Sequence, residues 1–312
     1  MASFLSWLHR CCIGLVAGAF LATAAHAADA PVFKDEELDQ MLAPIALYPD
    51  SLLSQVLMAS TYPADVADAA KYVKAHPDDK GEAAVKKAQA DPQGKDWDPS
   101  VQSLVAFPQV LAMMGDKPDQ VQRLGDAFLA DPARVLDRVQ FLRKKAQEAG
   151  NLKTNEQQKV STTTQESKQV IVIEPAQPTT VYVPVYQPAT VYGAWWYPAY
   201  PPYYWPPPAY YYPPGAAFVG GVLWGAAIVG IGNAIWGDVN WGRGDVNIDI
   251  DRYNNINVGN KINNGNFQHN AERRRDVPYR DQVSRDKYAR PSAGAQDRQA
   301  YRGNDGRDAQ RQ

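Results

Sequence analysis

The stretch DPARVLDRVQFLRKKAQEAG, residues 131–150, carries the clearest helical pattern in the chain. Asp131 is placed to cap a helix and Pro132 to open it, because a proline in the first turn gives up no intrahelical hydrogen bond. Gly150 is typical of the position just past a helix end. The apolar side chains recur at helical spacing and share one face: Val135, Val139, Leu142 and Ala146. The stretch therefore predicts one amphipathic helix.

The same design recurs upstream, where short amphipathic segments begin at prolines. In the segment YPDSLLSQVLMAS, which opens at Pro49, we expect Leu53 and Val56 on the apolar face to be buried. Further openings occur at Pro63, Pro108 and Pro118. We therefore predict a mainly α protein, with roughly six or seven short helices in an α-helical domain over residues 35–150.

Beyond the helical segments the composition changes several times. Residues 151–168 are polar and predict a helix tail that runs into a linker. Residues 169–193 contain β-branched residues in alternation and predict two short strands, arranged as a hairpin. Residues 194–215, rich in Tyr, Trp and Pro, form a low-complexity segment that favours a polyproline II backbone. Residues 238–270 are rich in Asn and predict short strands. Residues 271–312 lack large aliphatic side chains and predict a disordered tail.

Residues 216–236 are apolar, rich in Gly and Ala, and predict a helix. Two interpretations of this helix stay open. The twenty residues from Ala216 to Ile235 would span about 30 Å as a helix, the thickness of a hydrocarbon core, and Gly221 and Gly225 would suit close helix packing in lipid. Alternatively, the helix packs on the helical domain of a soluble protein. The first interpretation predicts membrane contact through Ala216 to Ile235.

The N-terminal 27 residues have the pattern of a signal peptide. Arg10 provides a positive charge, an apolar run follows, and Ala25 and Ala27 frame a typical cleavage site. The alternative is an uncleaved membrane anchor. We expect an exported protein of the periplasm or cell envelope. Cleavage would remove both cysteines, and the remaining chain would then offer no thiolate nucleophile and no Cys/His zinc site.

The Tyr/Trp/Pro-rich region and the residues just before it present aromatic side chains without any charge between residues 175 and 237. Three interpretations compete: a stiff spacer, a surface that stacks on sugar rings, and a belt at a membrane interface. For the last two we predict an aromatic contact surface made of Tyr182, Tyr186, Tyr192, Trp195, Trp196, Tyr197 and Trp205.

The acidic clusters and the histidines are the residues of this sequence that could serve as catalytic or metal-binding groups. The contiguous acids at residues 35–39 suit the positive end of a helix dipole better than a catalytic pair held across a cleft. His76 lies at a helix end, where it interacts with the dipole, although Asp78 lies near enough in sequence to pair with it. Asp245, Asn247, Asp249 and Asp251 alternate on a predicted strand, but an EF-hand glycine and distal Glu are missing. We predict no catalytic, cofactor or metal residue.

Several motifs resemble the bacterial family known as domain of unknown function 3300. They are LAPIALYPDSLLSQVLMASTYP (residues 42–63), WDPSVQSLVAFPQVLAMM (97–114), LGDAFLA (124–130), AQEAGNLKTNEQQKV (146–160) and VIVIEPAQPTTVYVPVYQPATVYG (170–193). The resemblance covers most of the chain between the leader and the Tyr/Pro stretch. It implies an exported envelope protein of Gram-negative bacteria and brings no known activity, cofactor or catalytic residue.

Two classes of function follow. The first is a non-enzymatic envelope protein with a structural or interaction role, whose partner is another envelope protein or a component of the cell wall or membrane. The alternative is an enzyme that acts on the cell wall or a polysaccharide through helix carboxylates. The first is favoured because no set of nucleophile, base and orienting group can be assembled. A formal net charge of -2 suggests no nucleic-acid partner.

Overall fold

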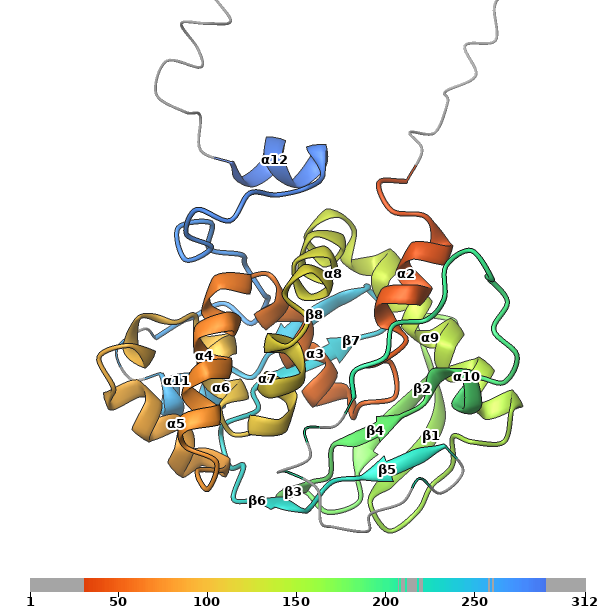
Figure 1. The fold of residues 1–312 in the computed structure, drawn as a ribbon, viewed down its shortest axis with the longest axis horizontal. Coiled ribbons are helices and arrows are strands. Elements are labelled where there is room, and N and C mark those ends of the chain that lie inside the picture. The colour runs from red at the N-terminus through yellow and green to blue at the C-terminus, as the bar shows by residue number, and fades with distance from the viewer. Residues whose placement is uncertain are drawn as a thin grey trace, which may run out of the picture. The chain divides into compact units, whose positions relative to one another are not determined.

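A succession of short helices fills the first half of the chain (Figure 1). The computed structural model describes residues 31–289 except 207, 209, 210, 212–217, 219, 220, 258 and 260. The helices are α2 (Asp35–Leu42), α3 (Asp50–Ser60), α4 (Pro63–Ala75), α5 (Gly81–Ala90), α6 (Pro99–Leu104), α7 (Pro108–Gly115), α8 (Pro118–Ala130) and α9 (Pro132–Glu148). Proline opens α4, α7, α8 and α9, as the sequence predicts, and it also opens α6; Pro49 lies just before the first residue of α3. The Asp131 carboxylate accepts a hydrogen bond from the Arg134 amide at 3.0 Å. The protein is mainly helical.

Short antiparallel strand pairs follow the helices. They are β1 (Gln158–Gln165) with β2 (Lys168–Pro175), β3 (Thr180–Val181) with β6 (Ile228–Val229), β4 (Pro184–Tyr186) with β5 (Val222–Trp224), and β7 (Gly237–Asn240) with β8 (Asp245–Ile248). Three short helices complete the described chain: α10 (Pro188–Val191), α11 (Ile250–Ile256) and α12 (Gln282–Tyr288). The region 238–270 thus contains predicted short strands, but also α11.

The hairpin lies earlier in the chain than predicted. β2 pairs with β1, which falls in the stretch 151–168 that was predicted as a linker, while β3 and β4 pair with strands about forty residues later. β-Branched residues such as Val160 and Thr162 favour the extended backbone of β1. Glu166 and Ser167 have φ values of 44° and 70°, the positive values that a two-residue hairpin turn requires.

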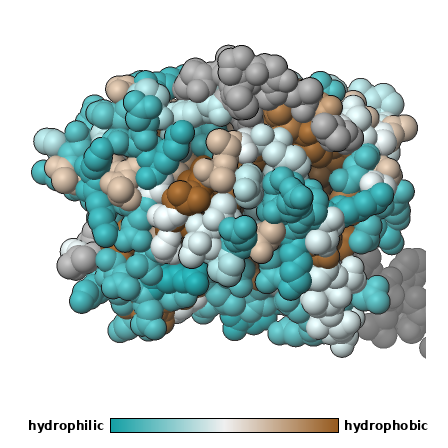
Figure 2. Space-filling view, turned by 90° about the horizontal axis from the view of Figure 1, so that it is seen from below, coloured by the Kyte–Doolittle hydropathy of each residue, from teal (hydrophilic) through white to brown (hydrophobic). Residues whose placement is uncertain are grey.

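The prediction of an apolar helix over 216–236 is wrong where the structure describes this segment. β5 and β6 lie there, and residues 216, 217, 219 and 220 are outside the described residues. Gly221, Gly230 and Gly232 have φ values of 80°, 66° and 40°, a left-handed backbone that interrupts a helix. Across the described residues, the structure contains no helix with the length and hydropathy needed to cross a bilayer. On the face in Figure 2, the described surface is mostly hydrophilic, with small hydrophobic patches.

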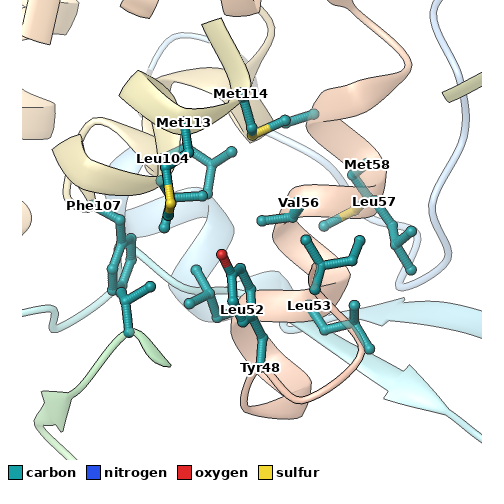
Figure 3. Packing of buried hydrophobic residues seen from close by; sticks show 14 of the residues in the cluster. Tyr48, Leu52, Leu53, Val56, Leu57, Met58, Leu104, Phe107, Met113 and Met114 are labelled. Atoms are coloured by element: carbon teal, nitrogen blue, oxygen red, sulfur yellow. The ribbon is translucent and has the colours of Figure 1, made fainter. Parts of the chain in front are cut away.

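The core is centred on α3 and is shared by both halves of the chain. Leu53 and Val56 are fully buried, which confirms the prediction for this helix. Figure 3 shows their neighbours on α3, α6 and α7, which include Leu52, Leu57, Leu104, Met113 and Met114. At Gly237 of β7, a Cβ would lie 2.6 Å from the Met58 Cε, so glycine allows β7 to approach α3 closely. The core formed by the helices of residues 35–150 is therefore continuous with residues of the later strands.

The tail predicted as disordered is ordered from residue 271 to residue 289, while 290–312 lie outside the described residues. Arg274 is buried and forms an ion pair with the buried carboxylate of Asp126 on α8. The helix α12 lies beside α8 (Figure 1). The prediction of disorder was wrong because it rested only on the lack of large aliphatic residues and did not consider buried ion pairs. In the structure, arginine side chains bind acidic groups of the helices and hold the segment in place.

Candidate functional site

A cavity of about 260 Å³ lies where the start of α6, the β8–α11 region and residues 261–268 meet. We call it the Asp98 pocket, after the one carboxylate that lines it. Its aromatic residues are Tyr62, Trp236, Tyr253 and Phe267. Its side-chain amides are Asn263, Asn264, Asn266 and Gln268. Lys261 contributes an ammonium group, and its side chain is exposed.

Asp98 is fixed at the base of this pocket because it caps α6. It precedes Pro99, the first residue of the helix, and one carboxylate oxygen accepts hydrogen bonds from the Ser100 amide at 2.9 Å and the Ser100 hydroxyl at 2.7 Å. The side chain is buried, and burial raises the pKa of Asp98, while the hydrogen bonds from Ser100 act in the opposite direction. The result is a hydrogen-bond acceptor of defined position.

The hydroxyl of Tyr62 connects Asp98 to the C-terminal part of the chain. It forms a hydrogen bond with the Asp98 carboxylate, and it accepts one from the Asn270 amide at 2.9 Å. Burial, with the charge of Asp98 as a smaller cause, raises the pKa of Tyr62 well above its usual value. The hydroxyl therefore stays protonated at neutral pH and donates to Asp98.

Asp65 on α4 lies behind Asp98. One of its carboxylate oxygens accepts a hydrogen bond from the Asp98 amide at 2.8 Å. The other lies 2.6 Å from a guanidinium nitrogen of Arg275, a close ion pair that is not aligned as a hydrogen bond. Burial raises the pKa of Asp65 to about 6, against the opposing effects of the Asp98 amide and Arg275. Asp65 thus supports the backbone of Asp98 from outside the pocket.

The amide-rich wall is held in place by its own backbone contacts. The side chain of Asn254 donates to the Ile262 carbonyl at 2.9 Å and accepts from the Ile262 amide at 2.8 Å. The Phe267 amide donates to the Val246 carbonyl at 3.1 Å, which ties this segment to β8. Because the backbone is held by these bonds, the exposed side chains of this wall are presented toward solvent and the pocket.

Three consecutive arginines anchor the segment that follows. Arg273 donates to the carbonyl of Trp97 at 2.7 Å, next to Asp98. Arg274 reaches Asp126, as described above, and Arg275 donates to Asp68 at 2.8 Å besides its ion pair with Asp65. We call residues 270–280 the C-terminal arm. The arm does not line the Asp98 pocket, but Arg273 and Arg275 hold it against Trp97 and Asp65, which adjoin Asp98 in sequence or by hydrogen bond.

A larger polar cavity, of about 370 Å³, lies beside Asp50. The buried carboxylate of Asp50 already has partners within the protein at both oxygens. Asp50 forms an ion pair with the buried Arg143 at 2.6 Å and accepts hydrogen bonds from the Trp241 indole at 2.8 Å and the Ile173 amide at 3.2 Å. This network joins α3, α9, β2 and the β7–β8 turn. We regard it as structural and take the Asp98 pocket as the candidate site.

The predicted aromatic contact surface is divided between the core and the surface. Tyr186, Tyr192 and Trp205 are buried, and the Tyr192 hydroxyl donates to the Ala43 carbonyl at 2.8 Å. The remaining four are half-buried: Tyr182, Trp195, Trp196 and Tyr197. The rings of Trp195 and Trp196 stack at 4.4 Å, and the Trp196 indole donates to Asp39 at 2.9 Å. None of the seven lines the Asp98 pocket.

The acids at residues 35–39 dock α2 on its neighbours. Asp39 is buried and accepts from the Arg138 Nε at 2.6 Å, while Asp35 pairs with Arg134. Burial raises the pKa of Asp39, and Arg138 opposes that rise. This cluster therefore joins α2 to α9, a contact that sequence spacing alone did not indicate.

His76 and the alternating acids near β8 also have local structural contacts. The His76 ring lies 2.9 Å from the Tyr72 carbonyl at the end of α4 and stacks on Tyr72. Asp249 caps α11 by accepting from the Arg252 amide at 3.0 Å, and Asp245 lies 3.5 Å from Arg243. No group of His, Cys, Asp or Glu within the described residues has an arrangement that could hold a metal ion.

The Asp98 pocket was not predicted from the sequence. The motif WDPS, residues 97–100, contains a helix-capping pattern, with Asp98 before a proline, and this signal was available. The pattern alone would still indicate only a cap. The pocket depends on residues 261–268, about 160 residues later in the chain, and no local pattern places that segment beside α6.

Comparison with known proteins assigns the chain to a family. Residues 34–276 match the family model described as "Protein of unknown function (DUF3300)", and the chain belongs to this family. It is similar to the "Uncharacterized protein YacH" of Escherichia coli (strain K12), with 37% identity over an alignment of 313 positions that covers 80% of this chain and 49% of that protein. The chain thus spans about half the length of this curated relative. No solved structure matches it.

Proposed function

We propose that this chain is an exported, non-enzymatic protein of the cell envelope that binds an envelope component in the Asp98 pocket. The observation that carries the proposal is the composition of the pocket. Aromatic rings and exposed side-chain amides surround one buried, hydrogen-bonded carboxylate. Ligand pockets of proteins commonly combine apolar walls with a few polar groups of fixed position, as here.

A binding role is favoured over catalysis by the way in which the two carboxylates are held. Asp98 is committed to Ser100 and Tyr62, and Asp65 faces Arg275 and the backbone of Asp98. A general acid and base pair would need both carboxyl groups to reach the substrate. Asp65 is fully buried and does not line the pocket.

The cellular location in this proposal rests on the signal-peptide pattern of residues 1–27, which lie outside the described residues. Membrane contact through Ala216 to Ile235 is not part of it. Leu223, Ile228 and Ile235 in that segment are buried in the protein, where they contribute to the common core. The proposed partner is therefore a component of the cell wall or another envelope molecule.

Capture of envelope material by the purified protein tests this function. Asn263→Ala combined with Gln268→Ala removes two exposed amides from the pocket wall with little effect on folding, because neither side chain is buried. Gln147→Ala is the matched control, an exposed amide on α9 away from the pocket. We expect wild type and control to retain envelope material and the double variant to lose it. Equal retention by all three proteins would contradict the proposal.

The alternative function is hydrolysis of a wall polysaccharide, and the observation that favours it is the proximity of Asp65, with a pKa near 6, to Asp98. Asp98→Asn tests it, because Asn also caps helices but has no charge. Under our proposal, neither wild type nor this variant releases soluble sugar from isolated cell-wall material. Release by wild type that the variant abolishes would establish the enzyme instead.

A further inference from the structure

We infer that the Asp98 pocket recognises one uncharged sugar unit of an envelope glycan, through its hydroxyl and acetamido groups. This inference rests on the proposed function and names the class of the ligand. Three properties of the pocket carry it: its volume, the nature of its walls, and the kinds of hydrogen-bonding group that it presents.

The volume of the pocket fits a small unit. Pockets for drug-sized ligands have volumes of about 300–1,000 Å³. The Asp98 pocket, at about 260 Å³, lies just below that range. It therefore suits one ring of a longer molecule better than a complete large ligand. The amides of Asn263, Asn266 and Gln268 are exposed, so neighbouring units of a chain could continue along this wall.

The walls provide apolar contact for a ring. Phe267 is half-buried and packs on Phe128, with ring centroids 5.9 Å apart, so its ring is supported from behind. Trp236 is fixed by a hydrogen bond from its indole to the Ser103 hydroxyl at 2.7 Å and meets Tyr253 edge to face. Trp236 and Tyr253 are buried and form a rigid support, so Phe267 provides most of the accessible aromatic surface, at a low cost in conformational entropy. The apolar face of a sugar ring is a suitable partner for such a surface.

The polar groups match hydroxyl and amide partners. Each side-chain amide provides two N–H donors and an oxygen acceptor, which are the groups that bind an acetamido substituent or a hydroxyl. The carboxylate of Asp98 accepts only; besides the hydrogen bonds from Ser100 and Tyr62 it has one further acceptor position, which would receive a hydrogen bond from a sugar hydroxyl. A site with buried polar groups of this kind discriminates strongly against ligands that leave those groups unpaired.

The charges around the pocket favour a neutral ligand. A cationic ligand would benefit from the aromatic rings and Asp98, but Lys261 lies on the same wall and repels it. An anionic ligand would meet Lys261 favourably but would approach Asp98, which is already desolvated. A neutral, hydroxyl-rich unit avoids both costs.

Titration of the full-length mature protein with chitotriose, a neutral oligosaccharide that carries acetamido groups, tests the inference. Calorimetry gives the dissociation constant, and the fluorescence of the buried Trp236 provides a second signal, which Trp236→Phe should remove. We expect Asn263→Ala with Gln268→Ala to weaken binding about tenfold or more, through the loss of two hydrogen bonds. The control Gln147→Ala should bind as wild type does. Choline is the cationic comparison ligand.

Saturable binding of chitotriose that the double variant weakens would support the inference. Binding of choline in preference to the sugar, or binding of chitotriose that the double variant leaves unchanged, would overturn it. The envelope capture experiment separates the two proposals. If capture depends on the pocket amides but chitotriose does not bind, the binding function stands and the sugar assignment fails.

Discussion

At the scale of single residues, buried carboxylates decide where distant segments dock. Asp50, Asp126 and Asp65 lie on three different helices, and each faces an arginine. A buried charge without a partner is strongly unfavourable, whereas a satisfied pair need not add much stability. The arginines therefore specify which segments must come together. Exposed pairs such as Arg280 with Asp119 contribute little, because solvent screens them.

Removal of Arg274 should have a large effect for this reason. Arg274→Ala leaves Asp126 buried without its cation and also frees the Thr61 carbonyl, which accepts a hydrogen bond at 3.1 Å. We expect the free energy of unfolding to fall by about 3–5 kcal/mol. Arg280→Ala, which removes a largely exposed ion pair on the same arm, should cost less than about 1 kcal/mol. Urea unfolding of both variants measures the two losses in free energy of unfolding. Losses of similar size would contradict the conclusion that the buried pair of Arg274 and Asp126 anchors the arm.

Asp65 should give the stability a distinctive dependence on pH. Its pKa of about 6 in the folded protein is raised above the usual value of 3.8, so the folded protein is stabilised by protonated Asp65 at low pH and loses that contribution as pH rises through about 6. Asp65→Asn removes this titration but keeps an oxygen that can accept from the Asp98 amide. Between pH 4 and pH 6.5, wild type should therefore lose about 1–3 kcal/mol relative to the variant.

The titration of His269 also changes the stability with pH, so the effect of Asp65 has to be measured as a difference between wild type and Asp65→Asn. Burial, with the positive charges of Arg274 and Lys287, lowers the pKa of His269 to about 3. Its contribution to stability is full above the unfolded pKa of 6.5 and falls as pH decreases toward 3, opposite to that of Asp65. His269 contributes equally to the free energy of unfolding, measured with urea, of wild type and of Asp65→Asn, so its contribution drops out of the difference between the two proteins. Parallel pH profiles for the two proteins would show that Asp65 does not titrate in this range.

At the scale of elements, local patterns indicated the helices well and the strands less well. A proline in the first turn or just before it, together with an apolar face, was enough to predict α3 and α9, because both signals are local. The strand β3 has only two residues and pairs with β6 across a long separation, so its partner is set by tertiary packing. The apolar segment 216–236 was assigned by composition. Its glycines instead allow the chain to turn between short strands.

The candidate site illustrates the same limit. The capping role of Asp98 could be predicted from the residues around it, and the pocket could not. Its wall comes from residues 261–268, whose Asn-rich composition suggested strands or coil and gave no indication of a partner. The packing of this segment against β8 brings it to the start of α6 and creates the pocket. The seven predicted aromatic residues lie elsewhere: three of them are buried, and Trp196 contacts Asp39 of α2 and Phe141 of α9.

At the scale of the whole molecule, the helices and the later strands belong to one compact unit that begins at Val32. A fragment of residues 32–150 would expose the faces of α3 and α9 that β2 and β7 cover, and would leave Asp126 and Asp65 without their arginines. We therefore expect this fragment to lack a cooperative thermal transition in circular dichroism, even where it retains helical signal. Residues 32–289 should unfold cooperatively. A sharp transition of the shorter fragment would show that the helices enclose a sufficient core, and that the arm only adds to a domain already formed.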